Sequence, residues 1–532
     1  MKKICPNFLF VVFLCFLAGT VNAQEVLGYF KVHDADGPLI LRVISVANAS
    51  DAGNGVIKVA LPGGVIGAAD LVETGNAMAS PVRVKTPYGI HAWRKESLFS
   101  YVYGGTGADL FTGLALTNDG GIILGGYTNS WGSGYYDQMM IKTDLAGSIT
   151  WSGVYGDAQS ETGQSVIQKT DGGYLVLGTA SSGSESYMYL NFINSSGSST
   201  LDGYFLTPTG YTYGNDVIQC EDGNFIGAGH VTGFGAGGYD AYVKKFTSSG
   251  GNVWGYAIGS IYDEVAKEIV QRADGGYAVT GYVTDENSDY DVYFLMLDAE
   301  GNPEIAYSLG GSSGDYAEAI CKADDNGFVT IGRTWSFGSG SWDYYLIKRA
   351  SNGDYSWAKA IGGTGADLGE DIACTNDGGF ILTGKTDSFG AGGLDLWLVK
   401  TDSFGNAQWS WVFGGTGNEA GYAVRQGSDG CFYVGGIASS YGAGGNDALL
   451  VKFTQDGSTC LGYAIGFTSS MMPLDEENSM FKAQHVENFN VTIVNDEERT
   501  LGASSVTLQN QFVQSSRKSR DFITPTITTV CN

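Results

Sequence analysis

The sequence predicts an all-β protein built from a repeated unit of four short strands. The first observation is a turn motif, Asp followed by Gly or Asn, that occurs seven times at intervals of 51 or 52 residues. The seven turns begin at Asp119, Asp171, Asp222, Asp274, Asp325, Asp377 and Asp429. Such a turn between two apolar runs is typical of a β-hairpin, because glycine adopts the positive φ that primed hairpin turns need. The period fits a four-stranded unit.

Composition supports this fold class and excludes some partners. The chain has 81 Gly, 31 Tyr and 26 Phe but only 9 Pro among 532 residues, which favours short strands and tight turns over helices or disorder. Its formal net charge of −27 disfavours nucleic acid and anionic membranes as partners, because their phosphates attract clustered Lys and Arg. We expect cations or neutral surfaces instead.

The first 23 residues have the pattern of a secretory signal peptide. Lys2 and Lys3 precede an apolar run at 8–17, and a small-residue cleavage site at 21–23 comes before Gln24. No later stretch is long and apolar enough to span a bilayer. The sequence therefore predicts a secreted or surface-associated protein. Its cysteines after residue 23 are too sparse for a disulfide-built fold, and we expect most of them to be buried in strands.

Three regions follow the leader. Residues 24–97 lack the repeat but are rich in β-strand signals, so we expect a small separate β domain there. The repeat runs from about residue 98 to residue 467, and each unit supplies four strands, A to D. In the sixth unit we place these strands at 368–375, 380–386, 394–401 and 407–413. The tail, 468–532, loses the glycines and is expected to be extended, draped over the repeats or partly disordered.

The apolar pattern decides how the units pack. Strand B begins close behind each turn Asp as a nearly unbroken apolar run, which is typical of strands buried on both faces. Seven such sheets satisfy both faces by packing radially around an axis, which predicts a seven-bladed β-propeller. An eight-bladed ring is the alternative, but it needs three more strands from a tail without repeat landmarks. Either 99–103 or 461–465 resembles strand D and is expected to complete the last blade.

All seven units also place a glycine inside strand B, seven residues after the turn Asp. These glycines are Gly126, Gly178, Gly229, Gly281, Gly332, Gly384 and Gly436. A glycine inside a strand indicates close approach by another backbone. We expect that backbone to belong to a neighbouring blade.

Two families resemble parts of this pattern. Segments such as 413–417 (Phe-Gly-Gly-Thr-Gly), with turns such as 376–380 (Asn-Asp-Gly-Gly-Phe), resemble the SBBP-type β-propeller repeats of secreted and surface prokaryotic proteins. That resemblance covers about 370 residues; it implies fold and extracellular setting and brings no catalytic residues. Segment 142–147 followed by Trp151 resembles the tryptophan-docking repeat of quinoprotein propellers. A quinoprotein-like or glycan-active enzyme is therefore the alternative function.

Two families of loops are expected on one face of the ring, because the strands of a blade alternate in direction. The B–C loops run from an aromatic residue to an Asp, as from Trp131 and from Phe337, and the D–A loops end in acids such as Asp109. Sugars stack on aromatic faces and Ca²⁺ takes oxygen ligands, so this face predicts a site for a glycan or a Ca²⁺-bridged partner. The alternative is structural: the acids accept backbone N–H groups and the aromatic rings fill space between blades.

Specificity is expected where the repeat varies. One position beyond the glycine of strand B, the residues are Tyr127, Thr179, His230, Tyr282, Arg333, Lys385 and Ile437. This position lies at the loop end of strand B, on the predicted binding face. Our candidate ligand-binding residues are Tyr127, His230, Tyr282, Arg333 and Lys385, with Trp131 and Phe337 from the loops. The alternative is that these side chains only fill local space.

The sequence offers a candidate metal site but no apparent catalytic one. The fourth unit replaces the loop pattern with an acidic segment whose Asp285, Asp289 and Asp291 are candidate Ca²⁺ ligands. The chain has 4 His, only His230 lies within the repeats, and no Ser/His/Asp or Cys/His pairing is apparent. We therefore expect a non-catalytic, monomeric propeller that binds an extracellular glycan or protein, with Ca²⁺ as the one candidate cofactor.

Overall fold

The computed structural model describes residues 99–457, apart from 206–209, 234, 236, 287, 391, 443–444 and 456, and, outside this span, the backbone of the strands given below. The chain divides into two compact units, Met1–Ser97 and Leu98–Asn532. The first is one antiparallel sheet in which the strands pair in chain order. Its strands are β1 (Phe10–Val12), β2 (Gly28–Asp34), β3 (Gly37–Ala47), β4 (Val56–Ala60), β5 (Ile66–Val72), β6 (Val82–Thr86) and β7 (Gly89–Trp93). Strand β1 lies within the expected signal peptide, whose removal stays a prediction.

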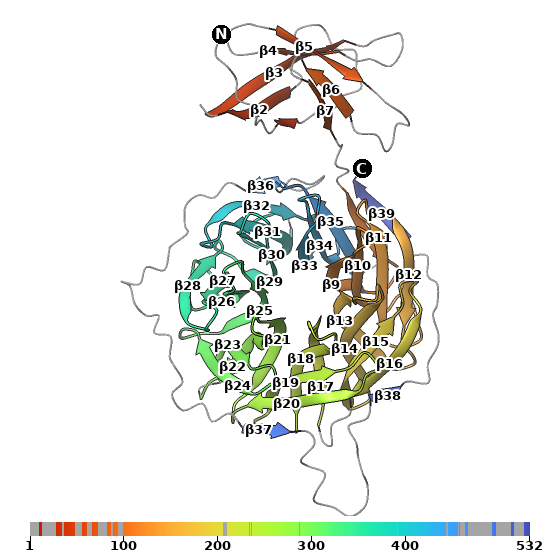
Figure 1. Ribbon diagram of the computed structural model, residues 1–532, viewed down its shortest axis with the longest axis vertical. Helices are drawn as coiled ribbons and strands as arrows, with labels where there is room; N and C mark the ends of the chain where they lie inside the picture. Colours follow the sequence, from red (N-terminus) through yellow and green to blue (C-terminus); the bar gives the residue numbers. More distant parts are fainter. Residues whose placement is uncertain are drawn as a thin grey trace, which may run out of the picture. The chain divides into compact units, whose positions relative to one another are not determined.

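The second unit is a closed ring of seven four-stranded antiparallel blades, a seven-bladed β-propeller (Figure 1). The strands nearest the axis, type A, are β9 (Asp109–Leu116), β13 (Ser160–Gln168), β17 (Thr212–Gln219), β21 (Glu264–Gln271), β25 (Asp315–Lys322), β29 (Asp367–Cys374) and β33 (Glu419–Gln426). Type B strands are β10 (Gly121–Thr128), β14 (Tyr174–Ser182), β18 (Phe225–Thr232), β22 (Tyr277–Thr284), β26 (Phe328–Thr334), β30 (Phe380–Thr386) and β34 (Phe432–Ala438). The seven-bladed prediction is confirmed, and the eight-bladed alternative is wrong.

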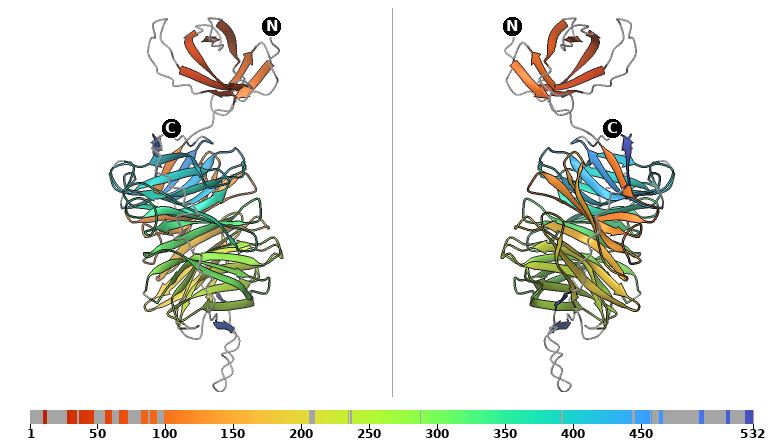
Figure 2. Two further views of the ribbon diagram at one scale, coloured as in Figure 1. Left: turned by 90° about the vertical axis from the view of Figure 1, so that its left-hand side faces the viewer. Right: turned by 90° about the vertical axis from the view of Figure 1, so that its right-hand side faces the viewer.

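The outer two strands complete each blade, and Figure 2 shows the ring from two further sides. Type C strands are β11 (Asp137–Asp144), β15 (Glu185–Ile193), β19 (Tyr239–Phe246), β23 (Tyr290–Leu297), β27 (Asp343–Arg349), β31 (Asp395–Thr401) and β35 (Asp447–Phe453). Type D strands are β12 (Ile149–Tyr155), β16 (Ser199–Phe205), β20 (Asn252–Gly259), β24 (Pro303–Leu309), β28 (Tyr355–Ile361), β32 (Ala407–Phe413) and β8 (Ser100–Gly104). Strands β27 and β31 are buried along their whole length, as the apolar pattern predicts for sheets covered on both faces.

The N-terminal strand of the unit closes the ring. Strand β8 pairs with β35, so the first strand of the propeller is the D strand of blade 7. The other candidate segment forms β36 (Tyr463–Ile465), which adds a fifth strand to blade 6. Further tail strands lie outside blades 3, 2 and 7: β37 (Thr492–Asn495), β38 (Phe512–Gln514) and β39 (Thr526–Cys531). Among the helices of the described residues, none is long and apolar enough to cross a membrane.

The repeated A–B turn is held by its aspartate. In blade 6, Oδ1 of Asp377 accepts the N–H of Gly379 at 3.1 Å, and Nζ of Lys400 lies 2.9 Å from Oδ2. An ion pair of this kind occurs at all seven turn aspartates. Gly378 has a φ of +78°, whereas Asp377 does not have positive φ. The N–H of Gly378 donates to the carbonyl of Thr375, so the left-handed glycine follows the two central residues of the turn. The turn therefore matches the three-residue hairpin with one left-handed residue after the turn, and not the primed turn that we predicted, in which a central residue is left-handed.

The glycine inside each strand B does mark a close backbone approach, but the prediction of a neighbouring blade is wrong. A methyl group added at Gly384 would lie 2.0 Å from the carbonyl oxygen of Leu368, in strand A of the same blade. A methyl group at any of the seven glycines would lie 1.8 to 2.0 Å from the corresponding carbonyl oxygen. The cause is a β-bulge in strand A, which brings its backbone against strand B at this point.

The D-strand tryptophans join neighbouring blades. A methyl group at Gly405 in the C–D turn of blade 6 would lie 2.6 Å from the ring of Trp357 in blade 5, and one at Gly301 in blade 4 would lie 2.8 Å from Trp254 in blade 3. Each ring thus covers the turn glycine of the next blade. The glycine and tryptophan spacing that resembles the quinoprotein repeat serves blade packing here.

Candidate functional site

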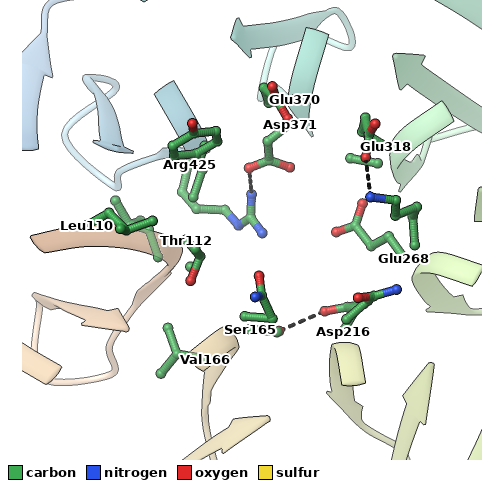
Figure 3. Close-up of a pocket in the computed structure, with 18 of the residues that line it drawn as sticks. Leu110, Thr112, Ser165, Val166, Asp216, Glu268, Glu318, Glu370, Asp371 and Arg425 are labelled. Atoms are coloured by element: carbon green, nitrogen blue, oxygen red, sulfur yellow. Dashed lines mark hydrogen bonds and ion pairs between the residues drawn. The ribbon is translucent and has the colours of Figure 1, made fainter. Parts of the chain in front are cut away.

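The type A strands surround a polar cavity on the axis of the ring, which we call the channel (Figure 3). Its volume is about 340 Å³. In every blade, the register of strand A against strand B shifts at the same place, which leaves one residue of a β-bulge without a partner. These residues are Thr112, Gln164, Asn215, Lys267, Glu318, Glu370 and Tyr422, and each of them lines the cavity together with its following neighbour. The bulge thus sets two successive residues of each blade beside the channel.

Three acids of the channel bind the neighbouring blade. Asp216 accepts the backbone N–H of Ile269 at 3.1 Å, and Glu268 accepts that of Ile320 at 2.5 Å. Asp371 repeats the contact with the backbone of blade 7, and it also lies 2.6 Å from the guanidinium of Arg425. Burial raises the pKa of Glu268 well above its usual value, and the charges of Asp216 and Asp371 add to this. These acids therefore serve cohesion between blades.

Two candidate ligand residues are engaged in ion pairs beside the channel. Nη1 of Arg333 lies 3.1 Å from Glu318, whose other oxygen lies 2.8 Å from Nζ of Lys267. Nζ of Lys385 lies 2.8 Å from Glu370. Burial alone would raise the pKa of Glu318, but Lys267 and Arg333 hold it below its usual value. Arg333 and Lys385 are thus partners of two acids that line the channel in neighbouring blades.

The other predicted residues pack against aromatic neighbours. His230 stacks on Tyr213 with ring centroids 4.4 Å apart, and burial followed by the charge of Lys267 lowers the pKa of His230 to about 4. Tyr282 meets Tyr316 at 5.2 Å. His230 is therefore neutral at physiological pH, which leaves it a hydrogen-bonding and stacking group.

Of the remaining candidates, Tyr127 lies beside the channel, and Phe337 and Trp131 pack between blades. Tyr127 lies 5.0 Å from Tyr136 and also lines the channel. Phe337 packs on Tyr345 at 5.8 Å, and Trp131 packs against a buried cluster that contains Tyr103. The two loop aromatics thus match the structural alternative, because they fill space at blade junctions. Phe234, which begins the corresponding loop of blade 3, lies outside the described residues.

A set of exposed aromatic residues on the same face was missed by the sequence reasoning. Tyr135 is 71% exposed, Trp335 55% and Tyr239 41%, and all three lie in B–C loops or at their ends. Ile261, 76% exposed, lies in a D–A loop. The ring of Trp335 lies 5.1 Å from that of Trp342. These residues fall outside the repeated columns, so only their large apolar side chains in loops gave a signal.

The acids of the predicted face are buried instead of exposed. Asp343 ends a B–C loop and is 1% exposed; Asp367 ends a D–A loop and is fully buried. A methyl group at Gly362 would lie 1.9 Å from Oδ1 of Asp343 and 2.6 Å from Oδ2 of Asp367, so the two carboxyl groups share the space beside this glycine. Oδ2 of Asp367 accepts the N–H of Gly363 and the hydroxyl of Ser388, each at 2.7 Å. Burial raises the pKa of Asp343 to about 7, and the neighbouring charge of Asp367 contributes.

The same arrangement recurs at five other blade junctions. The glycines at which an added methyl group would meet two carboxyl groups are Gly104, Gly156, Gly259, Gly310 and Gly414. At Gly156 the acids are Asp137 and Glu161, and burial raises the pKa of Glu161 to about 8. These acids anchor the loops through their buried carboxyl groups.

The candidate Ca²⁺ ligands lie at the junction of blades 4 and 5. Oδ1 of Asp285 accepts the N–H of Asp289 at 2.9 Å, and burial, followed by the charges of Asp315, Asp285 and Asp289, raises the pKa of Asp291 to about 7. Within the described part of the chain, no three acidic, histidine or cysteine side chains form a group that could hold a metal ion. Binding of Ca²⁺ by Asp285, Asp289 and Asp291 stays a prediction.

No family model matches the chain, so the resemblance to SBBP-type repeats stays a prediction. The chain is similar to the regulatory protein FlaEY of Caulobacter vibrioides, with 29% identity over 30% of this chain and 20% of that protein. It thus spans about a fifth of the length of this curated relative.

Several solved structures are similar at low identity. Sqt1 from Chaetomium thermophilum is 9% identical, with a TM-score of 0.39 over 68% of this chain and 99% of that chain. The polysaccharide lyase Uly1 is 10% identical, with a TM-score of 0.40 over 69% and 94%. PorZ of Porphyromonas gingivalis, a bacterial surface component of the type-IX secretion system, is 12% identical, with a TM-score of 0.38 over 82% and 61%. At these identities the likeness says nothing of function.

Proposed function

We propose that this chain is a non-catalytic binding or scaffold module whose ligand face is formed by the B–C and D–A loops. One observation carries the proposal. Of the six exposed large hydrophobic side chains among the described residues, Tyr135, Tyr239, Ile261 and Trp335 lie in these loops or at their ends. Large apolar side chains that are exposed on a shared face are candidates for contact with a partner.

The loops beneath these side chains make the face rigid. Each is fixed to a blade by buried carboxyl groups, as Asp367 fixes Gly363 through its backbone N–H at 2.7 Å. A rigid platform loses little conformational entropy when a partner binds. Trp335 and Tyr135 offer flat rings of the kind on which sugars stack. The proposed partner is therefore an extracellular glycan or protein, bound by a secreted or surface-associated monomer.

A binding screen tests this proposal. The purified full chain is applied to a glycan array and to intact bacterial and host cells, with and without EDTA. We expect saturable binding to at least one glycan or cell surface, and loss of binding with EDTA would add Ca²⁺ to the site. Turnover of any glycan or, with added quinone cofactor and Ca²⁺, of an alcohol would contradict the non-catalytic assignment. No binding to any array or cell surface would contradict the assignment of the partner.

A further inference from the structure

Two cysteines of neighbouring blades meet on the side of the ring opposite the proposed ligand face. Cys321 lies near the end of β25 in blade 5 and Cys374 at the end of β29 in blade 6. Their Sγ atoms are 2.7 Å apart. This distance lies between the ~2.05 Å of a disulfide bond and the ~3.5 to 4.0 Å of unbonded heavy atoms in contact. The backbone thus already brings the two sulfur atoms within bonding reach.

The other blades show which contact the position of Cys374, at the end of strand A, usually makes. At four junctions a glutamine at the end of strand A accepts a backbone N–H from the A–B turn of the preceding blade. Gln168 accepts that of Asn118 at 2.7 Å, and Gln426 accepts that of Asn376 at 2.8 Å. Gln219 and Gln271 make the same contact at 2.8 and 2.9 Å. Blade 6 has Cys374 in place of this glutamine, and it faces Cys321 of blade 5.

The surroundings of the two thiols differ. Cys321 is buried, and it belongs to an apolar cluster with Val329 and Ile331, whereas Cys374 is only half-buried. Burial, followed by the contact with Cys374, raises the pKa of the Cys321 thiol well above its usual value. Since the thiolate is the attacking species, the more accessible Cys374 is placed to react first.

We propose that Cys321 and Cys374 form a disulfide that links blade 5 to blade 6 and replaces the glutamine contact of the other junctions. The Cys374 thiolate attacks one sulfur of an external disulfide oxidant, which forms a mixed disulfide and releases one thiolate. Cys321 then loses its proton and attacks Sγ of Cys374, which expels the second thiolate. Two cysteine thiols are oxidised, the oxidant is reduced to two thiols, and the bond forms in an oxidising compartment such as the cell exterior.

Peptide mapping tests the bond directly. Trypsin releases Cys321 in peptide 273–322 and Cys374 in peptide 360–385, and each peptide contains one cysteine. The full chain, purified without reductant and treated with oxidised glutathione, is alkylated, digested and analysed by mass spectrometry. We expect the two peptides to be linked and to separate on reduction, while buried Cys220 stays reduced. Both peptides recovered as free thiols, or either one linked to another cysteine, would overturn the proposal.

A stability measurement shows whether the bond acts on the folded ring. The melting temperature of the oxidised chain should fall by several degrees on reduction, because a disulfide restricts the unfolded chain. The C321S and C374S variants should melt near the reduced protein and show no response to reductant. In the parent chain the thiol of Cys220 lies 3.6 Å from the hydroxyl of Tyr277, away from the proposed bond. The C220S variant should therefore keep the response to reductant. An oxidised protein that melts at the same temperature as the reduced one would contradict a stabilising disulfide between the two blades.

Discussion

Arg333 and Lys267 hold the two oxygens of one carboxylate, that of Glu318, at 3.1 and 2.8 Å. The side chain of Glu318 is 10% exposed. Removal of either cation therefore leaves a nearly buried carboxylate with only one ion-pair partner. The sequence predicts Arg333 to bind a ligand, and in the structure its guanidinium also pairs with Glu318. A substitution there therefore changes stability as well as any binding.

The R333A variant is expected to lose about 2 kcal/mol of unfolding free energy, since a desolvated charge loses a partner. Urea denaturation measures the loss. The R333K variant should keep much of the stability, because a cation stays within reach of Glu318, whereas E318Q should lose stability because it leaves Lys267 without its carboxylate. If R333A is as stable as the parent chain, the ion pair contributes nothing and Arg333 is available to a ligand.

Removal of an exposed aromatic ring should weaken binding without weakening the fold. We expect W335A to raise the Kd for the partner found in the screen about tenfold or more, since exposed tryptophan is the commonest energetic anchor of an interface. Y135A tests the opposite side of the same face. F404A is the matched control, because Phe404 is 67% exposed in a C–D turn on the other face. Equal affinities for W335A and F404A would show that the proposed face is not the ligand face.

The glycine inside strand B should be intolerant of a side chain. G384A places a methyl group 2.0 Å from the carbonyl oxygen of Leu368, and this backbone clash is expected to cost about 3 kcal/mol. G378A, in the turn of the same hairpin, meets nothing nearer than 3.7 Å; its φ of +78° should cost only about 1 kcal/mol. Denaturant unfolding of both variants checks the ranking. Similar losses would mean that strand A can move away from strand B at the bulge.

The buried carboxyl pairs predict that stability falls as pH rises. Asp343 has a pKa raised to about 7, and Glu161 one raised to about 8, so the folded state holds protons that the unfolded state releases near pH 4. By linkage, this contribution is full at pH 4 and is lost as pH rises through 7 to 8. The melting temperature should therefore fall between pH 5 and pH 9, and D343N, which mimics the protonated acid, should flatten this decline.

The turn aspartates supply the control for that pH series. Burial alone would raise the pKa of Asp377, but hydrogen bonds from Thr375 and Lys400 hold it below its usual value. Its contribution is present at neutral pH and is lost as pH falls through the lowered pKa. D377N should therefore lower the melting temperature at pH 7 and have little effect at pH 3. A melting temperature of the parent chain that does not change between pH 5 and pH 9 would contradict the assignment of protons to the carboxyl pairs.

Calcium offers a separate test of the acidic segment in blade 4. If Ca²⁺ relieves the repulsion among Asp285, Asp289 and Asp291, a millimolar concentration should raise the melting temperature, because the ion binds only the folded state. D289N should abolish the increase. Since D289N also removes one carboxylate from the neighbourhood of Asp291, the comparison is made with and without Ca²⁺ for each variant. No shift in the parent chain would contradict a site at these residues.

The fold could be predicted from the sequence because each blade repeats the same local rules. The Asp turn fixes the A–B hairpin, and the apolar run of strand B places it between two neighbouring blades. The glycine of strand B was recognised as a point of close approach, but its partner was assigned to another blade. The β-bulge that causes the approach has no signature in residue type, since its seven positions range from Thr112 to Lys267 to Tyr422.

The candidate site was predicted less well for the same reason. Arg333 and Lys385 were found by their variability, but their acids, Glu318 and Glu370, lie in another strand and meet them only through the fold. Phe337 packs on Tyr345, and Asp343 accepts a backbone N–H from Ser339, as the structural alternative expects. Trp335 stands one residue beyond the end of strand B and belongs to no column. Contacts between strands that are distant in the sequence decide what each of these side chains does. The spacing of residues along the chain does not reveal those contacts.

Strand β8 also dictates the order in which the propeller can be completed. It is the first strand of the ring to leave the ribosome, yet its partner β35 ends at Phe453. Until about 350 further residues have been synthesised, the edge of β8 has no in-register neighbour within its own blade, and blade 7 lacks its D strand. Contacts of such long sequence separation form last and slowly. Closure of blade 7 is therefore a late step of folding, and the outermost strand β39 can pair with β8 only after still more of the chain has been made.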